Sequence, residues 1–266
     1  PAFSLHIGDI KSGSTPCSDE LLNKHLAYFA TFEQPVVYSI GDNEWTDCHR
    51  DRAGKFEPRE RLDYLRKAAF AEPKSLGKTP MPLVRQADVM PEFATYVENS
   101  RWVFNNVLFV SVHIVGSNNN FERAIEAVQE NIARNKANLA WIDDAFRLAA
   151  AENRAGIVFG FQADMWYAPE QATELSSGYR DSLAAFTRGA QAWGKPVLLI
   201  QGDSHVLKFD QPLKVPGGRA TLPNVFRLQV MGESEVHAVR VTVDPADPSV
   251  FGIKPLMVWE NSPPAK

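Results

Sequence analysis

The chain is organised around residues 41–50, Gly41-Asp42-Asn43-Glu44-Trp45-Thr46-Asp47-Cys48-His49-Arg50, which directly follow the apolar run 35–40. An apolar run of this kind, ended by a glycine, is typical of a buried strand in an α/β sheet. Polar and ionisable side chains then gather at the C-terminal end of the expected strand, where ligands bind in open α/β sheets. The pattern therefore predicts an α/β fold with a functional loop after this strand.

Two other apolar runs end in the same way. The run 3–7 leads into Gly8-Asp9, and the run 196–201 leads into Gly202-Asp203-Ser204-His205. Glycine and aspartate both favour turns, so a single end of this kind is explained equally well by the opening of a loop. Three such ends on one sheet predict a site lined with carboxylates.

The composition is that of an ordinary globular protein, with 44% hydrophobic and 23% charged side chains among 266 residues. The sequence shows no repeats or obvious linkers, so we expect a single domain over residues 1–266. The net charge is -4 without a basic block, which argues against a broad contact with a nucleic-acid backbone. The apolar runs are too short to span a bilayer.

The chain begins with Pro1 and enters an expected strand almost at once, so we expect a signal peptide, a strand or both to precede it. Its two cysteines, Cys17 and Cys48, each lie a few residues beyond a Gly-Asp strand end. If these two strands are neighbours, their loops meet and a Cys17–Cys48 disulfide is expected; the alternative is two buried free thiols. The disulfide and the missing N-terminus predict a periplasmic or secreted protein.

Helical patterns alternate with the apolar runs, as expected of a parallel sheet. The first helix starts after Ser18, a good N-cap ahead of two acids, and runs to about Phe32. The other expected helices are 58–66, 121–152 with a break near 135–136, and 178–193. The other expected strands are 107–115, 156–161, a hairpin of 93–97 with 101–104, and antiparallel strands 225–230, 236–243 and 256–259 of a second sheet.

Carboxylates, amides and a histidine at several strand ends are the groups that hold divalent metal ions. Paired metal ions clamp a phosphoryl group and lower the pKa of a bound water, which then attacks. The predicted metal ligands are Asp9, Asp42, Asn43, Gln162, Asp203 and His205, with Asp164 as a further candidate. The basic side chains predicted to bind phosphate oxygens are Lys11, Arg50 and Arg52.

Two histidines are further candidates for the site. His49 lies in the stretch 41–50, next to the predicted phosphate-binding arginines. His113 lies near the end of the expected strand 107–115 but among apolar residues, so it is either a site residue or a buried core histidine. Both are predicted to take part in proton transfer if they reach the site.

The order of these motifs resembles the calcineurin-like metallophosphoesterase superfamily, which includes the purple acid phosphatases. The likeness lies in Gly-Asp, then Gly-Asp-Asn-Glu, then an apolar strand with a polar end, then Gly-Asp-Ser-His, and it spans nearly the whole chain. The segment 141–146 also resembles the Trp-Leu helix that precedes the lone-histidine strand of that family. The resemblance implies a two-sheet β-sandwich flanked by helices, in four α/β/β/α layers.

The resemblance also implies roles for single residues. Asp9 falls on the bridging aspartate of the family, Asp42 on its asparagine ligand, Asn43 on its catalytic histidine, and Glu44 on the acid that follows. Gln162 stands where the lone histidine is expected, Asp203 at the first histidine of the last motif, and His205 at the second. The first motif of the family has no counterpart, which fits a strand that precedes Pro1.

Three family histidines are thus replaced, and the ligand set is rich in oxygen. This implies two divalent ions of the harder kind, Mg²⁺, Mn²⁺ or Ca²⁺ rather than Zn²⁺, with iron also compatible. With Asn43 in place of the catalytic histidine, the leaving group would be protonated by His49, His113 or a metal-bound water.

We therefore expect a metal-dependent hydrolase of small phosphate esters, either monoesters or diesters, that uses a metal-activated water. The alternative is a non-catalytic protein that binds phosphate esters or other anions on the same scaffold, with a decayed metal site. A third hypothesis is a calcium-stabilised interaction module.

Overall fold

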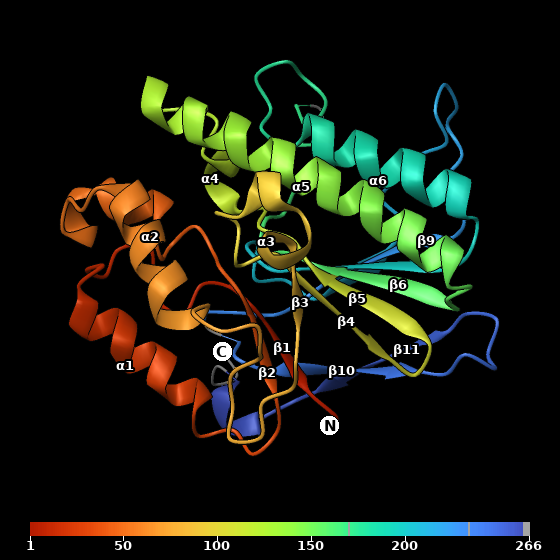
Figure 1. Cartoon of the computed structure of the whole chain (residues 1–266), viewed down its shortest axis with the longest axis horizontal. Helices are drawn as coiled ribbons and strands as arrows, with labels where there is room; N and C mark the ends of the chain where they lie inside the picture. The colour runs from red at the N-terminus through yellow and green to blue at the C-terminus, as the bar shows by residue number, and fades with distance from the viewer. Residues whose placement is uncertain (170, 234, 263–266) are drawn as a thin grey trace.

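A seven-stranded mixed sheet forms the centre of the structure, a computed structural model that describes residues 1–169, 171–233 and 235–262 (Figure 1). In order across the sheet, the strands are β3 (Val84–Arg85), β4 (Ser100–Phe104), β5 (Val107–Ser111), β6 (Gly156–Gly160), β7 (Val197–Gln201), β9 (Val225–Gln229) and β8 (Lys208–Asp210). The four strands from β5 to β9 run parallel, and antiparallel strands flank them on both sides. The α/β class is confirmed.

Two long helices, α5 (Ile125–Ala151) and α6 (Arg180–Trp193), cover one face of this sheet (Figure 1). Trp141 and Phe146 of α5 and Phe186 of α6 pack with Phe159 and Phe161 in one buried cluster. Burying a side chain of this size contributes on the order of 2–3 kcal/mol. Packing of α5 and α6 therefore stabilises the main sheet and the positions of its strand ends.

Two smaller sheets lie against the other face. Strands β1 (Ser4–Ile7) and β2 (Val36–Ser39) pair in parallel, and β10 (Ala238–Val243) pairs antiparallel with β11 (Phe251–Leu256). Ile7 and Val37 pack with Val158 and Leu198 of the main sheet. On the outer side, α1 (Asp19–Phe29) and α2 (Pro58–Ala69) share a further cluster with β2 (Figure 1). The chain thus forms successive layers of helix and sheet.

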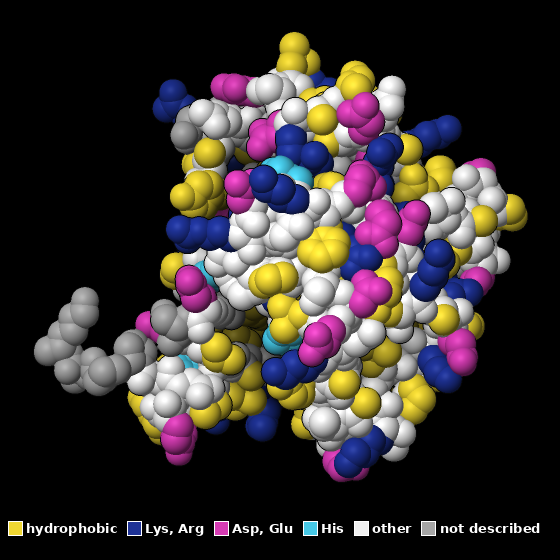
Figure 2. Space-filling view, turned by 90° about the vertical axis from the view of Figure 1, so that its left-hand side faces the viewer, with side chains coloured by type: hydrophobic (Ala, Val, Ile, Leu, Met, Phe, Trp, Pro, Cys, Tyr) yellow, Lys and Arg dark blue, Asp and Glu magenta, His cyan; other side chains and the backbone are white. Residues whose placement is uncertain are grey.

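The remaining elements are short. They are α3 (Gln86–Val89), α4 (Gly116–Asn119) and the 3-10 turns Thr46–His49, Asp51–Ala53, Pro91–Phe93 and Trp259–Asn261. Acidic and basic side chains are interspersed over the side that carries α1 and α2 (Figure 2). Within the described residues, no helix has both the length and the apolar character needed to cross a membrane.

Two local signals act as expected. The Ser18 hydroxyl accepts a hydrogen bond from Leu21 N at 3.2 Å and so caps α1. Asn105 and Asn106 join β4 to β5, and both have left-handed backbones with φ of 47° and 59°. Asparagine tolerates this conformation, which a two-residue hairpin turn of type I′ requires.

The expected hairpin of 93–97 with 101–104 is wrong. Phe93 ends a 3-10 turn, and β4 pairs instead with β3 and β5. The expected break in the helix 121–152 is also wrong, since α5 runs without interruption. Asn135 stays helical because its side chain accepts a hydrogen bond from Ser182 of α6 at 3.3 Å, a tertiary contact that outweighs its weak helix propensity.

The C-terminal strands are arranged differently from the prediction. Strand β9 lies in the main sheet, parallel to β7, and not in an antiparallel second sheet. It is buried on both faces, so its apolar residues mark a central strand. The expected strand 256–259 is wrong too, because β11 ends at Leu256 and Trp259 begins a 3-10 turn.

A Cys17–Cys48 disulfide is present, as predicted, with a Cα–Cα distance of 5.7 Å. It forms because β1 and β2 are parallel neighbours, so the loops that follow them lie side by side. Both cysteines are fully buried. A buried disulfide is compatible with an extracellular location.

Replacing both cysteines with serine is expected to lower the free energy of unfolding by about 3 kcal/mol. The two cysteines are 31 residues apart, and the unfolded chain regains the entropy of that loop when the link is lost. Equilibrium unfolding in urea measures the loss, and the m-value should rise as the unfolded chain expands. A loss below about 1 kcal/mol would show that the disulfide does not restrain these loops.

Candidate functional site

Three aspartates from three strand ends meet at one edge of the molecule. Asp9 follows β1, Asp42 follows β2 and Asp203 follows β7, and one carboxylate oxygen of each lies within 4.8 Å of the others. The expectation that the three strands share one sheet is wrong, because β1 and β2 form a small sheet of their own. The strand ends still converge because the two layers touch there: a Cβ at Gly202 would lie 3.2 Å from Ile7 O.

The buried amide of Gln162, just beyond β6, joins these carboxylates. Its Nε2 donates to Asp9 Oδ2 and to Asp42 Oδ1, both at 3.0 Å. Its Oε1 accepts from Gly116 N at 2.6 Å, which fixes the orientation of the amide. Gln162, which follows a strand of the main sheet, therefore binds two aspartates that follow the strands of the small sheet β1–β2.

The backbone at these strand ends adopts uncommon conformations. Asp9 has φ of 56° and Asp203 has φ of 71°, in the left-handed region that aspartate tolerates better than most residues. A Cβ at Gly41 would overlap Asp9 Oδ1 and lie 2.9 Å from Glu44 Oε2. Glycine at position 41 thus lets the two acidic loops approach each other closely.

The acids of this cluster raise one another's pKa values. Burial raises the pKa of Asp9 well above its usual value, and the charges of Glu44, Asp42 and Asp203 raise it further. Burial also raises the pKa values of Asp42 and Asp203. The three aspartates therefore concentrate negative charge in a place with little water, and a cation would stabilise their ionised form.

Glu44 lies next to this cluster and is completely buried. Its Oε1 accepts from Ile10 N at 3.0 Å and from the Tyr38 hydroxyl at 2.8 Å. Its Oε2 has no hydrogen-bond partner among the described residues, and burial raises the pKa of this carboxyl. A buried oxygen without a partner is costly unless a proton or a cation satisfies it.

Ser117 links the cluster to a further acid. Its hydroxyl oxygen lies 2.9 Å from Asp42 Oδ2 and 2.7 Å from Asp47 Oδ1. A hydroxyl has one hydrogen to donate, so the second contact needs a proton from an acid. Burial, followed by the charge of Asp42, raises the pKa of Asp47 to about 6, and burial also raises the pKa of Asp42, so either acid can carry that proton.

A run of left-handed residues positions Ser117. The φ angles from Ser117 to Asn120 lie between 50° and 62°. The fully buried Arg134 of α5 holds this run, donating to Asn119 Oδ1 at 2.7 Å and to Asn119 O at 2.9 Å. A charged side chain from a separate helix thus maintains a backbone that is unfavourable by itself.

The predicted phosphate-binding residues lie in the loops after β1 and β2. Arg50 is half-exposed and pairs with Asp47 at 2.6 Å. Lys11 is buried, and its Nζ donates to Ser12 O and Thr15 O at 3.0 Å each. Asn43 N lies 3.4 Å from Asp9 Oδ1. Arg52 is exposed on the turn after the disulfide.

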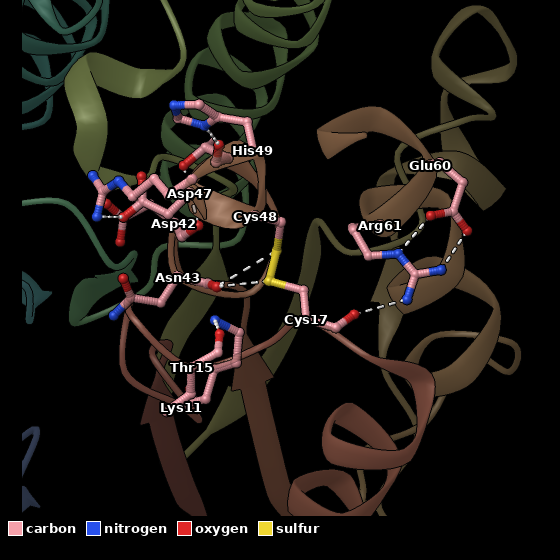
Figure 3. The surroundings of a disulfide bond; sticks show 12 residues. Lys11, Thr15, Cys17, Asp42, Asn43, Asp47, Cys48, His49, Glu60 and Arg61 are labelled. Atoms are coloured by element: carbon pink, nitrogen blue, oxygen red, sulfur yellow. Dashed lines mark hydrogen bonds and ion pairs between the residues drawn. A yellow bond between two sulfur atoms is a disulfide. The ribbon is translucent and has the colours of Figure 1, made fainter. Parts of the chain in front are cut away.

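The three histidines among the predicted site residues occupy different environments. His49 is exposed, with Nδ1 2.7 Å from Thr46 O (Figure 3). His205 Nδ1 faces Glu233 Oε2 at 3.0 Å. His113 is buried in the interior, with Nδ1 2.9 Å from Glu98 Oε1, and burial lowers its pKa. Its ring packs on Trp45 at a centroid distance of 5.4 Å, as expected of a core histidine.

Asp47 and Ser117 were not among the site residues predicted from the sequence. Asp47 had a local signal, since it follows Asp42 by five residues and the chain turns there, with Asp47 N donating to Asp42 O at 3.1 Å. Ser117 had only a polar loop after an apolar run. Its position depends on Arg134, which no local pattern connects to it.

The metal-free protein is expected to become more stable at pH 7 when Asp203 is replaced with asparagine. The raised pKa of Asp203 means that the folded state binds more protons than the unfolded state above about pH 4, so its contribution to stability falls as the pH rises. Asp203→Asn removes this loss, an effect of about 1 kcal/mol. Asparagine keeps an oxygen for Asp164 N, which lies 3.1 Å away.

Urea unfolding at pH 4 and pH 7, each with EDTA and with Mn²⁺, measures the effect. Mn²⁺ should stabilise the wild type at pH 7 by about 2–3 kcal/mol at a hundredfold excess over Kd, and should not stabilise Asp203→Asn. The exposed Asp51→Asn variant serves as the matched control. A gain in Asp203→Asn that persists undiminished at pH 4 would contradict the electrostatic explanation.

Comparison with models of protein families gives no match, and a search of curated proteins gives none either. The functional assignment of this chain therefore depends on the geometry of its own residues.

Proposed function

We propose that this chain is a divergent member of the calcineurin-like metallophosphoesterase superfamily and hydrolyses phosphate esters with the help of divalent metal ions. The observation that carries the proposal is the convergence of Asp9, Asp42 and Asp203 from three strand ends within 4.8 Å. The layered arrangement of helices and sheets supports the four-layer sandwich that this family implies. The buried disulfide supports an exported protein.

The residues present fit divalent metal ions of the harder kind. Asp9, Asp42 and Asp203 would hold them, and the backbone N–H of Asn43 donates to Asp9 Oδ1 at 3.4 Å. Carboxylate and amide oxygens favour Mg²⁺, Mn²⁺ or Ca²⁺ over Zn²⁺. A divalent ion in this place supplies Lewis-acid chemistry to a phosphoryl group and to water.

Gln162 orients the carboxylates in this proposal. Both hydrogens of its amide are directed at Asp9 and Asp42, and its oxygen accepts from Gly116 N. To ligate an ion itself, the Gln162 oxygen would have to release that backbone donor. These contacts therefore favour a positioning role for Gln162, which was predicted from the sequence to be a metal ligand.

Arg50 is the side chain best placed to bind a phosphate oxygen. Its guanidinium is held by Asp47 at 2.6 Å while half of the side chain stays exposed. A Cβ at Gly13 would lie 3.0 Å from Arg50 Nη1, so glycine there leaves space for the guanidinium. Lys11 orders the same loop by bonding its carbonyls.

Asp47 is the proposed proton donor to the leaving oxygen. Asn43 stands where the family resemblance expects the catalytic histidine, and an amide does not exchange protons at neutral pH. Asp47 has a pKa raised to about 6 and contacts Ser117, which can pass a proton on. A carboxyl with this pKa is partly protonated under mildly acidic conditions and suits general acid catalysis.

Replacing Asp9 with asparagine is expected to lower metal content and turnover together, with turnover reduced at least about a hundredfold. The substitution keeps the shape of the side chain but removes the charge that a cation requires. Elemental analysis and hydrolysis of 4-nitrophenyl phosphate, before and after added Mn²⁺, measure both quantities. Asp51→Asn is the matched control and should change neither.

Unchanged metal content and turnover in Asp9→Asn would refute the metal assignment. Stoichiometric binding of inorganic phosphate by the wild type, with no turnover under any metal, would favour the alternative of a non-catalytic anion-binding protein. The substitution of the catalytic histidine by Asn43 is the feature that keeps this alternative in view.

Replacing Asp47 with asparagine is expected to lower kcat for an alkyl phosphate about tenfold or more and to spare 4-nitrophenyl phosphate, whose leaving group needs no proton. In the wild type, kcat for the alkyl ester should fall as the pH rises, because Asp47 must be protonated, and the midpoint should lie below the metal-free pKa of about 6 because a bound cation offsets the charge of Asp42. Asp47→Asn should flatten that limb of the pH profile. An equal loss on both esters would indicate a structural role instead.

A further inference from the structure

A cavity of about 740 Å³ opens directly beside the acidic cluster. Asp203 and Ser117 lie in its wall, so it is continuous with the proposed reaction site. The rest of the wall comes from loop 117–122, from residues within 164–168 and 171–179, and from Ser204. Ligand pockets of this size hold a ring system with its polar substituents.

The cavity and the phosphate-binding side chains lie on different loops. Lys11 belongs to the loop that follows β1, near the disulfide (Figure 3), and Arg50 belongs to the loop that follows β2. The cavity belongs to the loops that follow β5, β6 and β7. Ser117 joins the two sides, because it lines the cavity and also contacts Asp42 and Asp47. A phosphate ester bound at the aspartates would thus direct its alcohol part into the cavity.

The walls of the cavity combine apolar, neutral polar and acidic side chains. Phe121, Met165 and Tyr167 supply apolar surface, and Tyr167 is 81% exposed. Glu122 supplies negative charge, whereas the charge of Asp164 is paired with the buried Arg227 at 3.5 Å. None of the described residues that line it is a lysine, an arginine or a histidine. An exposed aromatic ring offers a stacking surface, and an acid such as Glu122, without a basic partner in the wall, repels anions.

We propose that this cavity binds the alcohol part of the phosphate ester and selects an alcohol that carries an uncharged or cationic ring over one that carries further negative charge. The inference rests on the proposed function, since it assigns the leaving group of that reaction. Tyr167 stacks on the ring, and Glu122 disfavours an anionic substituent on it. The substrate class is therefore a monoanionic or dianionic phosphate ester of a ring-bearing alcohol, and not a bisphosphate.

Binding of non-hydrolysable phosphonates to the Mn²⁺-loaded full chain tests this inference by calorimetry. Phenylphosphonate should bind at least tenfold more tightly than methylphosphonate, because only the former fills the cavity. 4-Carboxyphenylphosphonate should bind several-fold more weakly than phenylphosphonate, because its carboxylate meets Glu122.

Two variants localise the effect. Tyr167→Ala should reduce the preference for phenylphosphonate over methylphosphonate to about threefold or less, and Glu122→Gln should weaken the discrimination against the carboxylate. Tyr28→Ala is the matched control, because Tyr28 is an exposed tyrosine of α1. It should leave both ratios unchanged.

Equal binding of the two phosphonates, or a preference that Tyr167→Ala does not alter, would overturn the inference. Turnover of 4-nitrophenyl phosphate, measured on the same samples, separates it from the proposed function. Turnover without a preference for the ring refutes the cavity assignment alone, and a Tyr167-dependent preference without turnover refutes the hydrolase alone. Failure to bind any phosphonate, together with no turnover, refutes both.

Discussion

The two hydrogen bonds from Gln162 to Asp9 and Asp42 are the contacts on which the site depends. Gln162 extends from the main sheet, whereas the two aspartates extend from the small sheet β1–β2, so one amide sets the distance between the layers at this edge. Buried carboxylates this close repel each other, and a buried donor shared between them offsets part of that repulsion. Gly116 N fixes the amide from behind, which leaves both of its hydrogens for the acids.

The acidic cluster lowers the stability of the fold, and features outside it offset the cost. The Cys17–Cys48 link ties together the loops that carry Asp9 and Asp42. On the far side of that link, Arg61 of α2 donates to Cys17 O at 2.9 Å and pairs with Glu60 (Figure 3). The two loops are therefore restrained from behind, and the strained backbone at Asp9 can persist. Functional sites commonly store strain that the surrounding structure supports.

Local pattern was enough to predict part of this arrangement. Strands that end in Gly-Asp, the Ser18 cap and the neighbouring positions of Cys17 and Cys48 all follow from short-range chemistry. The sheet membership of β1, β2 and β9 did not follow, because a buried apolar run has the same appearance in a main sheet and in a small one. Ser117 could not be found either, since Arg134 holds its loop from a helix that begins eight residues further along the chain. A residue that is positioned by contacts between separate elements cannot be recognised from the hydrophobic periodicity of its own segment.

In the proposed function, Asp47 takes the role of proton donor because Asn43 cannot exchange a proton. Its pKa of about 6 has two main causes, burial and the charge of Asp42. A cation held by Asp42 would offset the second cause and lower the pKa of Asp47, so metal binding and proton donation are coupled at this site. Burial is the larger cause and does not depend on the cation. Burial thus continues to act on the pKa of Asp47 when a cation is bound. In the proposed mechanism, the Ser117 hydroxyl, which contacts both Asp42 and Asp47, passes the proton of Asp47 to the cavity side of the cluster.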